Sequence, residues 1–190
     1  MRSLYVAAGL ALCSANALAA DFGVGVSARS DDGFLYVPID VSKTFRIEPS
    51  FRYGTTELSY TQDGEVDGQD SETFEIGVGV FGVKQVTEAA HIYYGGRLAY
   101  VDTESTVTQP TSFGEVIRSE STQDGYRIGP TLGFEYIFGG HFSVGGEASY
   151  TFLKLEGEST ASIGDFSAST VETEQESNGT QTRLIFRYMF

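Results

Sequence analysis

The chain has 190 residues, which suits a single domain, and it is rich in glycine (23), phenylalanine (14) and tyrosine (11). Its formal net charge of −14 argues against nucleic acid as a partner, because binding to a phosphate backbone rewards basic surfaces. Its one cysteine, Cys13, lies near the N-terminus, so disulfides cannot hold the rest of the chain together.

The N-terminal segment is typical of a secretory signal peptide. Arg2 supplies a positive charge, residues 4–12 form an apolar run too short to cross a bilayer as a helix, and residues 17–19 match an A-x-A cleavage site. We therefore predict a signal peptide over residues 1–20, Sec-type export, and a mature domain over residues 21–190. A lipoprotein interpretation is weaker, since the bulky Leu12 precedes the cysteine where a small residue is needed.

Eight segments of alternating apolar and polar residues follow. Such alternation predicts strands that have two different faces. The first, second and fourth segments cover residues 22–29, 34–42 and 73–84. The third, fifth and seventh begin at residues 45, 91 and 141. The sixth ends near residue 138, and the eighth occupies the C-terminus. Pro49 and Pro130 fit poorly, because each removes a hydrogen-bond donor from a predicted ladder. Bulges or water are two ways to accommodate them, and both stay open here.

The connections between these segments alternate in length. Those at 43–44, 85–90 and 139–140 are short, those at 62–72, 106–118 and 158–174 are long and polar, and only 30–33 is an exception. Short turns at one end and long loops at the other are typical of outer-membrane barrels. The sequence predicts an all-β fold: an eight-stranded antiparallel up-and-down transmembrane β-barrel.

The last segment shows the two faces most clearly. Leu184, Phe186, Tyr188 and Phe190 share one face, and the other face includes Arg183 and Arg187. A strand with lipid on one side and a packed polar interior on the other has this pattern. We expect the aromatic face to meet lipid.

The opposite face of the segments carries charge. The basic residues of this face are all arginines and none is a lysine. Arginine is the preferred residue where an ion pair is removed from water. We therefore expect a plugged interior with a paired charge network, in which Asp40 lies opposite Arg46. A proton or ion path is the functional alternative, and a soluble lipocalin-like barrel with its aromatic residues inside is a further one. The predicted network comprises Arg29, Asp40, Arg46, Glu48, Arg52, Glu75, Arg97, Arg127, Glu135, Glu147, Arg183 and Arg187.

The predicted outer loops carry most of the acidic residues. They are expected to be solvated, and divalent cations that also bridge lipopolysaccharide phosphates are candidate partners. The residues are Asp63, Glu65, Asp67, Asp70, Glu72, Asp102, Glu104, Glu115, Glu120, Asp124, Glu156, Glu158, Asp165, Glu172, Glu174 and Glu176.

Evidence for catalysis in the sequence is weak. His141 and Ser143 have the H-x-S spacing of barrel-type lipid A deacylases, with Glu147 after them. We expect both to point inward beside a short turn, whereas a deacylase needs them outward near the other rim. No catalytic, cofactor-binding or metal-ligating residue is therefore predicted, and a lipid-modifying enzyme stays the least favoured alternative.

Residues 133–150 and 187–190 resemble the penultimate hairpin and terminal signal of small bacterial outer-membrane β-barrel proteins. These are the porin-family group of OmpX, the OmpA transmembrane domain and the opacity proteins. The resemblance implies a monomer in the Gram-negative outer membrane, with the barrel assembly machinery, lipid and lipopolysaccharide as partners. It also implies that Leu184, Phe186, Tyr188 and Phe190 serve as the signal for barrel assembly. It implies a structural or surface-interaction role, in adhesion or envelope integrity, or else a narrow porin-like channel for small solutes or ions.

Overall fold

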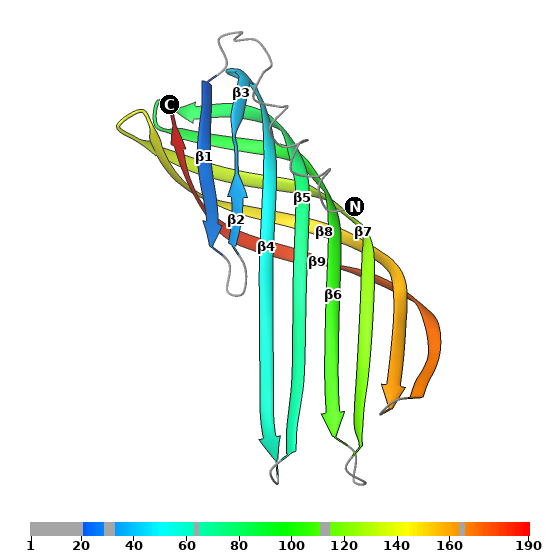
Figure 1. The fold of residues 1–190 in the computed structure, drawn as a ribbon. Helices are drawn as coiled ribbons and strands as arrows, with labels where there is room; N and C mark the ends of the chain where they lie inside the picture. The colour runs from blue at the N-terminus through cyan, green and yellow to red at the C-terminus, as the bar shows by residue number, and fades with distance from the viewer. Residues whose placement is uncertain (1–20, 29–32, 63–64, 111–114, 164–165) are drawn as a thin grey trace.

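The computed structural model describes residues 21–28, 33–62, 65–110, 115–163 and 166–190, so the predicted signal peptide lies outside the described residues (Figure 1). They form one antiparallel sheet of nine strands. Strands β1 and β9 also pair, so the sheet closes into a ring and confirms the predicted all-β, up-and-down architecture. Within this part of the chain, no helix is long and apolar enough to cross a membrane. The strands are β1 (Asp21–Ala28), β2 (Gly33–Tyr36), β3 (Ile39–Ser42), β4 (Phe45–Gln62), β5 (Glu65–Thr87), β6 (Ala90–Pro110), β7 (Val116–Phe138), β8 (Phe142–Ile163) and β9 (Phe166–Met189).

Strands β2 and β3 share one position in the ring, between β1 and β4. The segment predicted as one strand over 34–42 is interrupted at Val37 and Pro38, because proline cannot donate to a ladder. Two backbone hydrogen bonds cross the break, from Val37 to the Pro49 carbonyl and from Gly23 to the Pro38 carbonyl, each 2.9 Å. The ring therefore keeps eight strand positions.

The two prolines that fit the pattern poorly lie where ladders are interrupted. Pro49 faces the break between β2 and β3. The ladder between β7 and β8 stops at Ile128 and resumes at Thr131, which leaves out Pro130. The register is the same on both sides of each interruption. A short gap in hydrogen bonding, rather than a bulge, accommodates each proline.

The segments predicted as long outer loops, 62–72, 106–118 and 158–174, are mostly strand, so that prediction was wrong. Strand β5 begins at Glu65, β6 extends to Pro110 and β9 begins at Phe166. Threonine and valine recur in these segments, and their branched side chains suit extended backbone. The ladders that begin in the apolar part of the hairpins simply continue outward.

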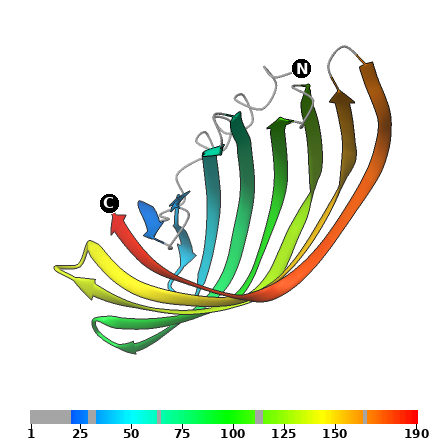
Figure 2. The same cartoon turned by 90° about the horizontal axis from the view of Figure 1, so that it is seen from below.

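Among the described residues, the ring is closed in one half of the molecule, the half that holds the short turns. Strand β1 pairs with β9 as far as Leu184, and β2 pairs with β4 at Ser50 and Phe51. Beyond these positions, among the described residues, β4 pairs only with β5 and β9 only with β8. Figure 2 shows the outer parts of β4 to β9 as one curved sheet with β4 and β9 at its edges. We call the closed part the inner barrel and the open part the outer sheet.

Large apolar side chains lie on the outside of the inner barrel. Tyr126 and Phe134 are 64% and 62% exposed, whereas Arg187 is 1% exposed. A lipocalin-like barrel would have the opposite arrangement, so that alternative is wrong. Of the predicted assembly signal, Leu184, Tyr188 and Phe190 are exposed and Phe186 is half-buried.

Aromatic contacts on the outside gather in two bands. Tyr126 and Phe138, which belong to different bands, lie twelve residues apart on β7. At ~3.3 Å per residue and a tilt of about 45°, the bands are roughly 28 Å apart, close to the ~25 Å apolar height of outer-membrane barrels. The inner band contains the ring pairs Phe22–Phe190, Tyr136–Phe138, Phe138–Phe142 and Tyr188–Phe190, and the outer band contains Phe51–Phe74, Tyr100–Tyr126 and Tyr150–Phe152.

Candidate functional site

Charged side chains inside the inner barrel form an alternating series of ion pairs. Asp40 accepts hydrogen bonds from Arg46 at 2.6 and 3.2 Å, in the cross-strand register expected from the sequence. Arg46 also contacts Glu135 at 2.9 Å, and Glu135 accepts from Arg187 at 2.9 Å. Arg187 then donates to Glu48 at 3.0 Å. Residues from four different strands are thus joined across the lumen.

The series continues from Glu48 to Arg97, whose guanidinium also donates to both oxygens of Glu147 at 3.0 and 2.7 Å. Glu147 contacts Arg183 at 2.8 Å, and Arg183 ends the series with a hydrogen bond to the Tyr36 hydroxyl. Apart from Asp40, no charged side chain in the series is more than 12% exposed. Four carboxylates and four arginines alternate, so this ion-pair chain is neutral.

A separate group lies nearer the outer sheet. Glu75 accepts a hydrogen bond from Arg127 at 2.7 Å and contacts Arg52 at 3.3 Å. This triad has a net charge of +1, and its carboxylate touches two guanidiniums, so loss of one arginine leaves an ion pair. Arg29, the remaining residue of the predicted network, lies outside the described residues.

The lumen also holds aromatic side chains that the sequence analysis did not assign to it. They share space with the arginines: the Arg97 guanidinium is 4.9 Å from the ring centres of both Tyr36 and Phe81. The Tyr93 ring covers Gly133, where an added Cβ would lie 2.1 Å from a ring atom. The sequence does contain a signal for these inward rings: in a strand, the residues next to an outward-facing side chain face inward. The four buried rings are Phe34, Tyr36, Phe81 and Tyr93.

Carboxylates form two rows across the outer sheet, on the same face as the aromatic bands. Residues directly opposite on antiparallel strands have Cβ atoms ~4.5–5.5 Å apart, so like charges in these positions repel. In the row farther from the outer aromatic band, Glu158 of β8 lies directly opposite Glu172 of β9. The first row is Asp102, Asp124, Glu156 and Glu174, and the second, farther from the outer aromatic band, is Glu72, Glu104, Glu158 and Glu172. We call these two rows the acidic face.

One lysine lies beside the acidic face. Lys154 contacts Glu174 at 2.8 Å and Glu156 at 2.9 Å, and hydrogen bonds to these two carboxylates raise its pKa above the usual range. Among the described residues, no three histidine, cysteine, aspartate or glutamate side chains gather closely enough to hold a metal ion. The acidic face is therefore a spread-out charged surface rather than a compact metal centre.

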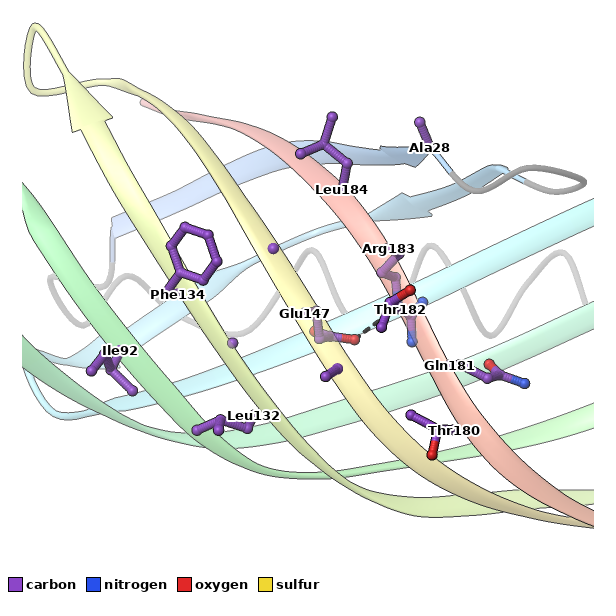
Figure 3. Close-up of a pocket in the computed structure, with 13 residues that line it drawn as sticks. Ala28, Ile92, Leu132, Phe134, Glu147, Thr180, Gln181, Thr182, Arg183 and Leu184 are labelled. Atoms are coloured by element: carbon purple, nitrogen blue, oxygen red, sulfur yellow. Dashed lines mark ion pairs between the residues drawn. The ribbon is translucent and has the colours of Figure 1, made fainter.

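A hollow of about 1140 Å³ lies along the wall formed by β7, β8 and β9 (Figure 3). Leu132, Phe134 and Leu184 lie around it. Gly146, which lies against the Phe134 ring, also lines it. Its two charged lining residues, Glu147 and Arg183, pair with each other as part of the ion-pair chain. The hollow presents an apolar rim between the two aromatic bands, which suits a hydrocarbon chain better than a polar ligand.

The H-x-S residues do not form a catalytic pair. Ser143 points into the lumen and donates to Glu135 at 3.4 Å, but His141 is exposed, with its ring 5.9 Å from Tyr188. Its Nδ1 lies 3.0 Å from the Met189 carbonyl oxygen. The expectation that both side chains point inward was wrong for His141, because it lies in the turn before β8 begins.

No family model and no curated protein matches the chain. Among solved structures, the chain is similar to a major outer membrane protein from Thermus thermophilus, with a TM-score of 0.56 and 15% identity over 90% of this chain and 100% of that one. The chain has the fold of an outer-membrane β-barrel. It also aligns with Acinetobacter baumannii CarO (TM-score 0.41, 12% identity, 90% and 96% covered) and CarO2 (0.43, 7%, 88% and 98%).

Proposed function

We propose that the protein is an integral protein of the Gram-negative outer membrane, closed to solutes, with a structural role at the membrane surface. The two aromatic bands support the membrane position, because their separation fits an outer-membrane bilayer. The ion-pair chain carries the proposal of a closed lumen. Eight alternating charges, with buried aromatic rings between them, fill an interior that in an eight-stranded barrel is only wide enough for side chains.

Planar-bilayer recording tests the closed lumen. We expect the purified protein to insert without single-channel steps, while a general porin recorded in parallel conducts. Reproducible steps from the wild type that change size in Arg97→Gln would instead support the narrow-channel alternative, since Arg97 binds two carboxylates at the centre of the chain.

The acidic face supports a role in holding the outer leaflet together. Tyr126 belongs to the outer aromatic band, and Asp124 of the acidic face lies two residues beyond it on the same face of β7. Phosphate-rich headgroups would therefore lie beside carboxylates, and two anionic surfaces meet favourably only when cations lie between them. We infer that divalent cations shared with lipopolysaccharide phosphates link the lipid layer to this face.

A charge-neutralising variant distinguishes this role from a passive surface. In lipopolysaccharide vesicles with EDTA, Glu158→Gln/Glu172→Gln should unfold at a higher temperature than the wild type, because a direct like-charge pair is removed. With millimolar Mg²⁺ the unfolding temperature of the wild type should rise more than that of the variant, so the difference between the two temperatures shrinks or reverses.

The matched control is Asp21→Asn/Glu88→Gln, which neutralises two exposed carboxylates at the other end of the barrel. Its response to Mg²⁺ should equal that of the wild type. Equal Mg²⁺ responses in all three proteins would contradict the proposed role of the acidic face. Cell fractionation with heat-modifiable gel mobility, together with the mass of the mature N-terminus, tests the proposed location and signal cleavage.

A further inference from the structure

Three arginines surround a small cavity between the ion-pair chain and the triad. The cavity has a volume of about 20 Å³, and its charged lining consists of Arg97, Arg127, Arg183 and Glu75. That volume accommodates about one water-sized group. A cation is disfavoured there, because three guanidiniums face a single carboxylate that already contacts two of the interior arginines.

Two residues that line this cavity carry a buried hydrogen-bond donor. The Ser149 hydroxyl and the Nη1 group of Arg97 are buried and have no hydrogen-bond partner among the described residues. Ser149 is only 4% exposed. A buried donor normally finds an acceptor, because leaving it without one costs about 1–3 kcal/mol. Ser149 and Arg97 line the same cavity as Arg127 and Arg183, so an acceptor placed there would lie beside both residues that carry these donors.

The cavity adjoins a polar vestibule that lies toward the outer sheet. The vestibule has a volume of about 230 Å³ and shares Arg127, Thr151 and Gln181 with the cavity. Its other lining includes Ser177 and Asn178, which carry no charge. A small solute from the outer side would therefore pass uncharged polar groups before it reached Arg127.

The charge balance of the lumen favours an anion as that solute. Among the described residues, the ion-pair chain is neutral and the triad has a net charge of +1. In a low-dielectric interior such an excess attracts a counter-ion more strongly than it would in water. Arg127, one of the two arginines of the triad, lines both cavities.

We propose that this cavity, together with the adjoining end of the vestibule, binds a small monovalent anion such as chloride. Arg127, the Ser149 hydroxyl and Nη1 of Arg97 hold it. The site is a recognition site above a closed lumen and not a step in a pore. The cavity itself, at about 20 Å³, is too small for a polyatomic anion as large as gluconate.

Thermal unfolding at constant ionic strength tests the site. Wild-type protein in detergent is titrated with sodium chloride that replaces sodium gluconate, and the line width of ³⁵Cl in NMR reports binding directly. For a site with a Kd of about 1 mM, 0.5 M chloride should raise the unfolding midpoint by about 10 °C. Arg127→Gln should abolish the rise, and Ser149→Val, which fills the cavity and removes a donor, should weaken chloride affinity at least tenfold.

Arg127→Gln is expected to fold, because Glu75 keeps Arg52 as its partner. Arg118→Gln is the matched control: it removes an equal charge from an exposed ion pair with Glu120, outside the lumen, and should keep the full chloride response. Equal wild-type curves in chloride and gluconate would overturn the proposal and leave water as the occupant. A response lost equally in Arg118→Gln and Arg127→Gln would also overturn it, since it would show non-specific screening. If Arg127→Gln does not fold, Ser149→Val decides alone.

Discussion

Glu48 is the central carboxylate of the ion-pair chain, and its replacement by glutamine tests the network most directly. Its side chain is fully buried and accepts from both Arg97 and Arg187. Glu48→Gln keeps the shape and leaves a net charge of +1 on the chain. Breaking a buried pair by removing one partner typically costs ~3–5 kcal/mol. Because the arginines keep Glu147 and Glu135 as second partners, we expect a loss of about 3 kcal/mol.

The assay is reversible urea unfolding in lipid vesicles, followed by circular dichroism and by the gel mobility of unheated samples, since the chain has no tryptophan. Glu120→Gln is the control, because its 2.9 Å ion pair with Arg118 is 58–59% exposed and should contribute no more than ~0.5 kcal/mol. A loss in Glu48→Gln within about 0.5 kcal/mol of the control would refute the idea of a desolvated network. The double variant with Arg187→Gln should show a coupling energy of about 1–3 kcal/mol.

Three further outcomes test the wall, the outer sheet and the terminal signal. Gly133→Ala should lower stability by about 1–3 kcal/mol because its Cβ meets the Tyr93 ring, and adding Tyr93→Leu should restore most of that loss in the same urea assay. Replacing residues 57–70 by Asn-Gly should leave a heat-modifiable barrel, because the hairpin lies beyond the outer aromatic band; failure to fold would contradict the division into barrel and outer sheet. Phe190→Ala should reduce the amount recovered in the outer-membrane fraction without a comparable loss of stability in vitro.

The sequence predicted the inner barrel well because two local rules apply there. A period of two assigns each side chain of a strand to one of two faces, and a tight turn sets the register of the next strand. Together they place Asp40 opposite Arg46. They do not identify partners across the lumen: Arg46 and Glu135 are 89 positions apart, and their contact depends on how the closed ring staggers its strands.

The outer sheet was missed for a different reason. Alternation of apolar with polar residues was the signal for a strand, but the outer parts of β8 and β9 alternate glutamate with glycine, serine, threonine or glutamine. Both classes are polar, so the segment looks like a loop. Glu172, Glu174 and Glu176 do recur at every second residue. Alternation of charge can therefore mark a strand that has both faces exposed to water.

The ion-pair chain and the acidic face lie in different dielectric environments, and added salt should therefore separate their contributions. The interior's described charges sum to +1, so taking them from the total of −14 leaves −15 for the rest of the chain, and much of that lies on the water-exposed acidic face. Salt at 1 M shortens the Debye length to about 3 Å, which screens exposed pairs but hardly affects buried ones. In sodium gluconate, the stability gained by Glu158→Gln/Glu172→Gln should therefore fall toward zero as salt rises to 1 M. The stability lost in Glu48→Gln should stay constant across the same titration. If both differences fell together with salt, the ion-pair chain would have to be as solvated as the outer sheet, and the lumen could not be closed.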